Sequence, residues 1–336
     1  MTPNGLSGAY NAGALPDDLA THRGFGRVFQ PGKLTLGLIA PLEGYPDSPS
    51  PTLANHVEMV RKADGIGIAA LWLRDVPFYD PSFGDVGQII DPMVYAGFLA
   101  AHTRQIAIGS AGVVLPLRDP LIVAKQSTSV DQLVGGRFLL GLSGGDRPEE
   151  FPAFGVAFEN RAERYRDAYA MIRAAVDNEF PHWRSEFYGE LSGTLDLIPK
   201  PVGQRLPAVA IGRSGQAIDW IAANMDAWIW HGMDARRMTD IVPTWRQATT
   251  GMPFKPYGYA TWFDLAEDPD APIQPGRVLR GGRHALIALW GEQEHAGVSH
   301  VVLNMKQTRR PVTEILDELA EYILPQFPSH TVGAPS

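Results

Sequence analysis

Short hydrophobic runs alternate with longer amphipathic stretches along most of the chain, and this rhythm predicts a repeated β/α succession. The runs are rich in β-branched residues and are flanked by Gly, Pro or Asp, as is typical of buried parallel strands. In the first amphipathic stretch, Leu53, Val57, Val60 and Ala63 share one helical face. The predicted strands cover residues 34–41, 70–75, 106–116, 137–143, 206–212, 227–232, 256–264 and 300–305.

Two Asp-Pro pairs, Asp91-Pro92 and Asp119-Pro120, predict helix starts, because Asp caps free N–H groups and Pro suits the first helical position. Gly135-Gly136 is typical of a helix end. The remaining helices are predicted over 159–177, from about 215, over 234–249, from about 283, and around 315–323. Residues 180–205 show no clear element, and residues 266–282 are predicted to form a loop.

Eight strands alternating with eight helices predict an α/β protein with a single (β/α)8 barrel and insertions in its carboxyl-end loops. An open doubly wound sheet is the alternative. It would favour a Gly-rich dinucleotide fingerprint after the first strand, and residues 41–51 (PLEGYPDSPSP) do not form one. We therefore expect an irregular arm over 1–32, a barrel domain over 33–328 and a short tail over 329–336.

Composition narrows the classes of partner. The 336 residues are 45% hydrophobic and 20% charged, and their net charge of −8 argues against nucleic acid or an anionic membrane as the main partner. The absence of cysteine excludes disulfides, thiolate metal sites and cysteine nucleophiles, and no His and carboxylate set has the spacing of a metal site. No signal peptide and no run long enough to span a membrane is visible, so we expect a cytoplasmic protein.

Small residues gather where two predicted strands end. Ser110-Ala111-Gly112 interrupts the third strand, and Ser143-Gly144 closes the fourth. Ligands of barrel enzymes bind at the carboxyl ends of the strands, and small residues there leave room for a large, flat ligand. The alternative for the first run is a plain β-bulge without a ligand.

The turn Arg213-Ser214-Gly215-Gln216 follows the strand over 206–212 and precedes a predicted helix. Free N–H groups at a helix start and the Ser214 hydroxyl favour binding of a phosphate. The alternative is that Ser214 only caps the helix. His231 ends another strand, which makes it a candidate proton donor or hydrogen-bond partner, although a structural histidine is the alternative.

Arg74 and Asp75 follow the second strand, where they form either a charged pair at the pocket or a buried structural pair. With His231 they are the candidate catalytic residues.

Residues 109–145 (GSAGVVLPLRDPLIVAKQSTSVDQLVGGRFLLGLSGG) resemble the bacterial luciferase-like flavin monooxygenases, and within them the luciferase-type oxidoreductases. Residues 70–92 and 145–155 show further similar patterns, and the resemblance extends from about 24 to 327. It implies a (β/α)8 barrel, often dimeric, that holds FMN or a deazaflavin coenzyme. It also implies a flavin ring against a bulge with a cis Ala111–Gly112 peptide.

The same resemblance implies that Ser214, Gly215 and Gln216 bind the phosphate and that Ser143 and Gly144 lie near the ribityl chain or the phosphate. Two departures limit it. Val76 stands where luciferases have a histidine, so light emission is not expected, and Gly144 stands where they have an arginine near the phosphate. Arg213, Arg147 or Arg118 would supply that charge instead.

The leading hypothesis is therefore an enzyme, an FMN-dependent monooxygenase that uses reduced FMN and O2 on a small organic substrate. A separate flavin reductase would supply the reduced FMN, since no dinucleotide fingerprint is visible. The alternatives are hydride transfer with a deazaflavin coenzyme, and flavin binding without turnover.

Overall fold

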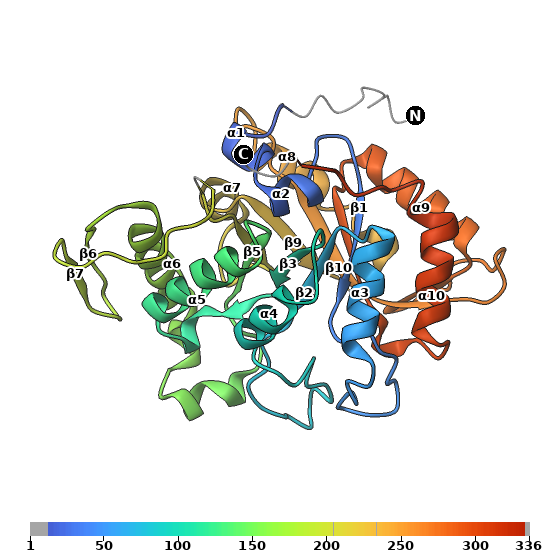
Figure 1. The fold of residues 1–336 in the computed structure, drawn as a ribbon, viewed down its shortest axis with the longest axis horizontal. Helices are drawn as coiled ribbons and strands as arrows, with labels where there is room; N and C mark the ends of the chain where they lie inside the picture. Colours follow the sequence, from blue (N-terminus) through green and yellow to red (C-terminus); the bar gives the residue numbers. More distant parts are fainter. Residues whose placement is uncertain (1–12, 204, 233, 333–336) are drawn as a thin grey trace, which may run out of the picture.

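The computed structural model describes residues 13–203, 205–232 and 234–332. Eight parallel strands close into a barrel in the order β1, β2, β3, β5, β8, β9, β10, β12, with β12 pairing back to β1 (Figure 1). The predicted (β/α)8 barrel is confirmed. The strands of the sheet are β1 (Thr35–Ile39), β2 (Ala70–Leu73), β3 (Ala107–Ser110), β4 (Val113–Val114), β5 (Phe138–Ser143), β8 (Ala208–Ile211), β9 (Ala227–His231), β10 (Tyr257–Leu265), β11 (Val278–Gly281) and β12 (His300–Asn304).

Helices surround the barrel, and both predicted Asp-Pro helix starts are confirmed. Asp91 Oδ1 accepts hydrogen bonds from the N–H groups of Met93 and Val94, and Asp119 caps the next helix in the same way. The α-helices are α1 (Asp17–Ala20), α2 (Arg23–Val28), α3 (His56–Ile66), α4 (Pro92–Ala100), α5 (Pro120–Leu133), α6 (Arg161–Asp177), α7 (Ile218–Asn224), α8 (Val242–Ala248), α9 (Arg283–Ala296) and α10 (Val312–Glu318).

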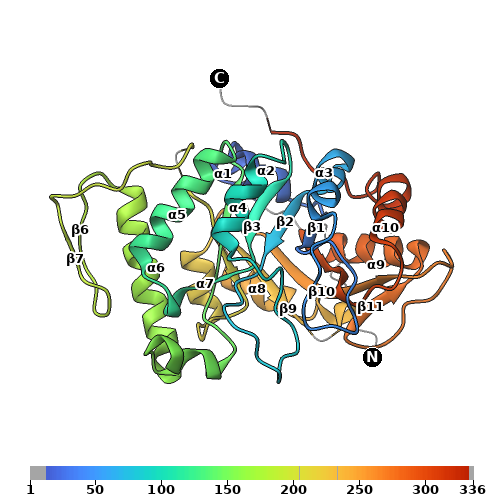
Figure 2. The ribbon, with the colours of Figure 1, turned by 60° about the horizontal axis from the view of Figure 1, so that its bottom comes forward.

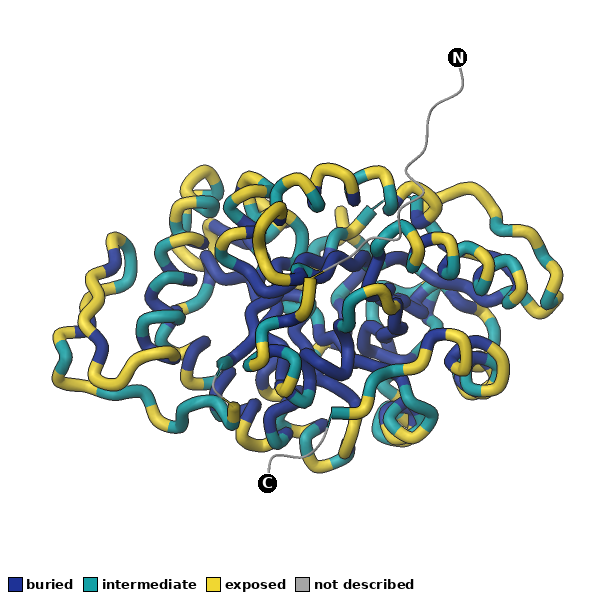
Figure 3. The backbone as a smooth tube through the Cα atoms, turned by 90° about the horizontal axis from the view of Figure 1, so that it is seen from above, coloured by how far each residue is buried: buried dark blue, intermediate teal, exposed yellow. Residues whose placement is uncertain are grey.

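The strands bury both faces, so the core has two layers. Along β2, Leu71 and Leu73 pack outward against the helices, whereas Ala70 and Trp72 point into the barrel. Figure 3 shows the buried backbone concentrated in the barrel and the exposed backbone in the outer segments. This burial on both faces explains why the strands appear in the sequence as continuous hydrophobic runs.

The amino-terminal segment differs from the irregular arm expected over 1–32. Residues 1–12 lie outside the described part, but α1 and α2 are helical and lie at the end of the barrel opposite the long loops (Figure 1). Phe25, Val28 and Phe29 are fully buried in the same cluster as Trp72. The segment is therefore part of the core, because its aromatic side chains close the amino-terminal end of the barrel.

Three further expectations are corrected. Residues 180–205 contain the antiparallel hairpin β6 (His182–Arg184) and β7 (Glu190–Ser192), which projects from the barrel in Figures 1 and 2. The predicted loop 266–282 contains β11, which pairs with β10. The predicted helix over 234–249 is a 3-10 turn followed by α8. No helix among the described residues is long and apolar enough to cross a membrane.

Candidate active site at the carboxyl end of the barrel

A cavity of about 540 Å³ opens at the carboxyl ends of the barrel strands. Every strand position of the ring contributes to its wall, so the cavity lies on the barrel axis. Its lining includes Ile39, Trp72, Ala111, Gly112, Ser143, Gly144, Ile211, Ile229, His231, Ala260, Trp262, Val302 and Asn304. The floor is apolar, and the charged residues come from the loops above it.

The interrupted third strand forms a bulge at this cavity. Pairing of β3 with β5 ends at Gly109, and pairing resumes at Val113 of β4. Between them the Ala111–Gly112 peptide is cis, as the resemblance implied, and both residues line the cavity.

Ser110, which the sequence places among the cofactor-binding residues, does not line the cavity, so its contact with a cofactor stays a prediction. Its side chain is buried, and its hydroxyl donates to the Gly141 carbonyl at 2.8 Å and accepts from the Gly141 N–H at 2.9 Å. These two bonds replace the ladder bonds that the bulge removes. Ser110 therefore stabilises the bulge from behind.

The backbone of Gly144 lies against the turn that begins at Ser214. A Cβ atom on Gly144 would lie 2.9 Å from Cα of Ser214, so only glycine permits this approach. Gly144, Arg213, Ser214 and Gly215 all line the cavity. The two small-residue segments predicted near a phosphate are thus brought together.

Ser214 has a left-handed backbone, with φ of 52°, and it does not cap a helix. If Ser214 were the N-cap, the helix would begin at Gly215. The helix α7 begins at Ile218, and its N-cap residue is Ala217. The Ser214 hydroxyl is buried at the cavity wall, where the Tyr165 hydroxyl is its neighbour and no described residue bonds it at regular hydrogen-bond geometry. Such a group is costly unless a ligand satisfies it.

Tyr165 of α6 is a candidate that sequence reasoning missed. Its hydroxyl is buried beside that of Ser214, outside regular hydrogen-bond geometry. Burial raises the pKa of Tyr165, and the interaction with the Ser214 hydroxyl counteracts that rise. No sequence signal could have found it, because Tyr165 appears as one of several inward-facing residues of an ordinary amphipathic helix.

Gln216 holds the turn from the side away from the cavity. Its Nε2 donates to the carbonyls of Ser214 and Ala162, and its Oε1 accepts from Arg166. Gln216 is not among the cavity-lining residues, so the structure places it behind the turn that Ser214 begins, and its predicted contact with the cofactor stays a prediction.

Arg74 and Asp75 do not pair with each other. Arg74 pairs with Asp85 at 2.5 Å, and Asp75 accepts two hydrogen bonds from Arg118 and one from the N–H of Val114. The Asp75 side chain is only 1% exposed. These bonds favour the structural alternative for Asp75. Arg118 also donates to Asp91, so its guanidinium is occupied by two carboxylates and is not available for a phosphate.

His231 lies at the end of β9 and faces the cavity. His231 is exposed to the cavity, but the protein atoms around its ring still remove part of its solvation and lower its pKa, and the positive charge of Arg74 lowers it further. The imidazole is therefore neutral at pH 7 and can accept a proton.

The cavity floor is held by a hydrogen-bonded chain inside the barrel. Trp72 Nε1 donates to His300 Nε2 at 3.0 Å, and the other ring nitrogen of His300 bonds Thr35, whose hydroxyl donates to a backbone carbonyl. Burial lowers the pKa of His300 to about 3, so this histidine stays neutral. Gly37 and Gly109 leave the space that the Trp72 ring occupies.

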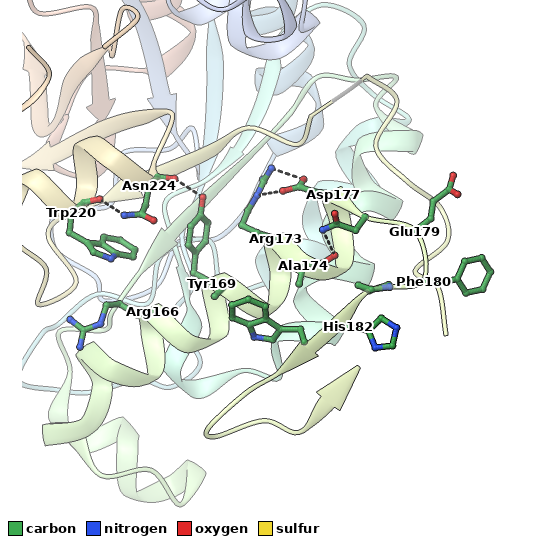
Figure 4. A pocket seen from close by; sticks show the side chains of 14 residues that line it. Arg166, Tyr169, Arg173, Ala174, Asp177, Glu179, Phe180, His182, Trp220 and Asn224 are labelled. Atoms are coloured by element: carbon green, nitrogen blue, oxygen red, sulfur yellow. Dashed lines mark hydrogen bonds and ion pairs between the residues drawn. The ribbon is translucent and has the colours of Figure 1, made fainter. Parts of the chain in front are cut away.

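A second cavity, of about 760 Å³, lies outside the barrel between α6, α7 and the segment leading into β6 (Figure 4). Several of its polar groups bond one another. Arg173 pairs with Asp177, and the Tyr169 hydroxyl donates to the Asn224 carbonyl. It contains none of the predicted cofactor residues, so the barrel cavity is the candidate site. No group of His, Asp or Glu in the described ranges could hold a metal ion.

Residues 34–261 match the model of the luciferase-like monooxygenase family. The chain belongs to this family. An uncharacterised protein of Mycobacterium tuberculosis is 26% identical over 201 residues, which span 56% of this chain and 68% of that protein. The alkanal monooxygenase beta chain of Photorhabdus luminescens is 31% identical over 106 residues, 32% of this chain and 33% of that protein.

A 4-hydroxyprotoasukamycin monooxygenase of Streptomyces nodosus subsp. asukaensis is 26% identical over 163 residues, 48% of this chain and 43% of that protein. Among solved structures, a monooxygenase from Streptomyces bottropensis superposes with a TM-score of 0.72 at 16% identity, covering 87% of this chain and 99% of that one. An F420-dependent secondary alcohol dehydrogenase superposes with a TM-score of 0.71 at 16% identity, and the superposition covers 88% of this chain and 99% of that one. At 16% identity, these TM-scores show that this chain shares the fold of the two solved structures.

The residues of the cavity fit a phosphorylated flavin. The buried Ser214 hydroxyl and the glycine contact at Gly144 suit a phosphate, with Arg213 beside them. The small residues Ala111 and Gly112 at the bulge and the apolar residues of the floor suit an aromatic ring system.

Proposed function

We propose that this protein is a flavin-dependent monooxygenase that uses reduced FMN and O2 on a small organic substrate. The supporting observation is the buried Ser214 hydroxyl, which no described residue bonds at regular hydrogen-bond geometry, beside Gly144 in a barrel cavity that also exposes the Ala111–Gly112 bulge. Similarity to two monooxygenases supports oxygen as the second substrate. Because no dinucleotide fingerprint is visible in the sequence, a separate reductase supplies the reduced FMN.

Each part of the cavity has its own task in this proposal. Ser214, the N–H of Gly215 and the Arg213 guanidinium bind the phosphate, and Ser143 and Gly144 leave room for the chain that leads to the ring. Ala111 and Gly112 support the ring, and the fixed Trp72 indole excludes water from below. Bound reduced FMN supplies the two electrons with which one oxygen atom enters the substrate and the other becomes water.

Ser214→Ala tests the cofactor site. We expect this variant to bind reduced FMN roughly 10–150-fold more weakly, because a hydrogen bond to a charged group contributes about 1.5–3 kcal/mol. Anaerobic titration measures the affinity, and Ser192→Ala in the exposed hairpin is the matched control. An unchanged affinity in Ser214→Ala would place the phosphate elsewhere.

The same titration separates the alternatives. A protein that binds the deazaflavin coenzyme F420 and not reduced FMN is a hydride-transfer enzyme. One that binds reduced FMN but oxidises no organic compound with O2, releasing only hydrogen peroxide, is a flavin-binding protein. Oxygen incorporation, measured with labelled O2, supports the monooxygenase.

His231 is proposed to act as a neutral hydrogen-bond or proton acceptor at the cavity. We expect an NMR titration to give His231 a pKa below the ordinary 6.5 and to show that this pKa rises in Arg74→Met, because that variant removes a nearby positive charge. His231 is thus neutral above its lowered pKa and loses its acceptor role as the pH falls through it. A pKa above 6.5, or one unmoved by Arg74→Met, would contradict this assignment.

We further propose a homodimer formed by the outer faces of α4 and α5. The two helices pack side by side and expose apolar residues that are 45–65% accessible, namely Val94, Phe98, Ile122 and Leu133. Two copies would bury them together. Sedimentation should give twice the 36.7 kDa of one chain, and Phe98→Glu should give a folded monomer; a wild-type monomer would refute the dimer.

A further inference from the structure

The barrel cavity has more positive charge than one phosphate requires. Five arginines line it, against three aspartates, and Asp75 is already neutralised by Arg118 from outside the lining. This excess occurs in a chain whose net charge is −8, so it is a local feature of the cavity. The lining arginines are Arg74, Arg147, Arg161, Arg213 and Arg277.

These arginines fall into two groups across the mouth. Arg213 follows β8 at the proposed phosphate turn, and Arg161 begins α6. Arg74 follows β2, which is three strands away from β8 around the ring, and Arg147 reaches to the loop after β2, where its Nη2 donates to the Asp85 carbonyl at 3.0 Å. One cofactor phosphate at the turn does not reach the second group, in which Arg74 pairs with Asp85 and Arg147 forms no ion pair with a described residue.

Arg147 is the best-defined residue of the second group. The residue is only 7% exposed, and its guanidinium carbon lies 4.6 Å from the centroid of the Phe83 ring. Its Nη1 is buried and has no hydrogen-bond partner among the described residues. Since an unpaired charged donor is costly to bury, this nitrogen is suited to an anionic ligand.

The acidic groups near Arg147 do not satisfy it. Asp85 pairs with Arg74, and Lys306 lies 3.6 Å from the same carboxylate. Glu150 and Asp80 are further acidic neighbours, and neither forms an ion pair or hydrogen bond with Arg147. Burial raises the pKa of Glu150, and the charge of Arg147 lowers it.

Arg277 adds a second cation on this side of the mouth. It is exposed, it has no hydrogen bond or ion pair with any described residue, and with Phe83 and Trp262 it lines both the barrel cavity and a recess beside it. Beneath these two arginines the cavity presents Trp72, Trp262 and aliphatic side chains. The combination suits a molecule with an apolar body and one charged end.

We propose that the substrate is a small organic anion whose carboxylate or sulfonate is bound by Arg147 and Arg277 while its apolar body lies on the cavity floor. This inference rests on the proposed function, in which the flavin phosphate occupies the turn at Ser214. Arg147 fixes the orientation of the substrate by a charge-assisted hydrogen bond.

Calorimetric titration of the full chain tests this proposal. Octanoate, octanesulfonate and the neutral octanamide are titrated anaerobically in the presence of saturating reduced FMN. We expect one or both anions to bind at least about tenfold more tightly than octanamide, since hydrogen bonds to charged groups exceed neutral ones. The ratio of the affinities for octanoate and octanesulfonate distinguishes a carboxylate site from a sulfonate site.

Arg147→Met is expected to remove the preference for the anion and to leave the affinity for octanamide within about twofold of the wild type. Arg277→Met should reduce the preference too, and it tests the proposal even if Arg147→Met does not fold, because Arg277 is exposed and unpartnered. Arg237→Met is the matched control, since it removes the same charge from a side chain that is 76% exposed outside the cavity.

Equal binding of the anions and the amide by the wild type would overturn the proposal, as would a preference that survives in both Arg147→Met and Arg277→Met. An anion that competes with FMN would be bound at the phosphate turn, which also overturns it. If reduced FMN binds normally while no anion is preferred, the substrate inference fails and the proposed function stands.

Discussion

Gly141→Ala is expected to lower the free energy of unfolding by more than about 4 kcal/mol, an unusually large effect for one methyl group. An alanine Cβ at this position would lie 1.7 Å from the carbonyl oxygen of Ser110. That oxygen cannot retreat easily, because the Ser110 hydroxyl is bonded to both backbone groups of Gly141. The methyl group therefore has to separate β3 from β5 at the bulge.

Chemical denaturation measures this effect. Gly65→Ala is the matched control, because Gly65 lies in α3 and an added Cβ would meet nothing within 4 Å. The control should be neutral or slightly stabilising, since alanine favours a helix over glycine by about 1 kcal/mol. A loss below about 1 kcal/mol in Gly141→Ala would show that the bulge is not held as tightly as its bonds indicate.

Gly144→Ala is expected to weaken reduced FMN binding by roughly 100-fold, or about 2.7 kcal/mol, while the protein stays folded. The added Cβ would lie 2.9 Å from Cα and 3.0 Å from Cβ of Ser214, so the turn has to move away. A displaced Ser214 loses its hydrogen bond to the phosphate, and the neighbouring N–H of Gly215 loses its alignment.

Anaerobic titration with reduced FMN measures the change. Gly291→Ala in α9 is the control, since a Cβ there meets nothing within 4 Å and the position is far from the turn in sequence. Retention of wild-type affinity by Gly144→Ala, with its fold confirmed by circular dichroism, would refute a phosphate at this contact.

The two predictions concern glycines only three positions apart. Gly141 lies inside the predicted strand over 137–143, and Gly144 follows its end directly. The structure separates them, because Gly141 lies within β5 against Ser110 and Gly144 lies beyond the strand against Ser214. Their neighbours come from other strands, so their different roles were not visible in the linear pattern.

The partners of the charged residues at the site were likewise not visible in the sequence. Arg74 and Asp75 are adjacent in sequence and were considered as one pair, but their partners are Asp85 and Arg118. Ion pairs depend on which loops meet above the barrel, and adjacent residues on extended backbone point to opposite sides. Tyr165 and the unpartnered Nη1 of Arg147 were missed for the same reason.

The sequence by itself determined the barrel and the two small-residue segments at its carboxyl end. Buried parallel strands require continuous hydrophobic runs, and Asp-Pro pairs cap helices through contacts within a few residues, so both signals are local. The tertiary structure decided that α2 closes the barrel, that Ser110 and Gln216 act from behind the site, and that five arginines share one cavity. These features depend on contacts between distant segments, which only the closure of the barrel brings together.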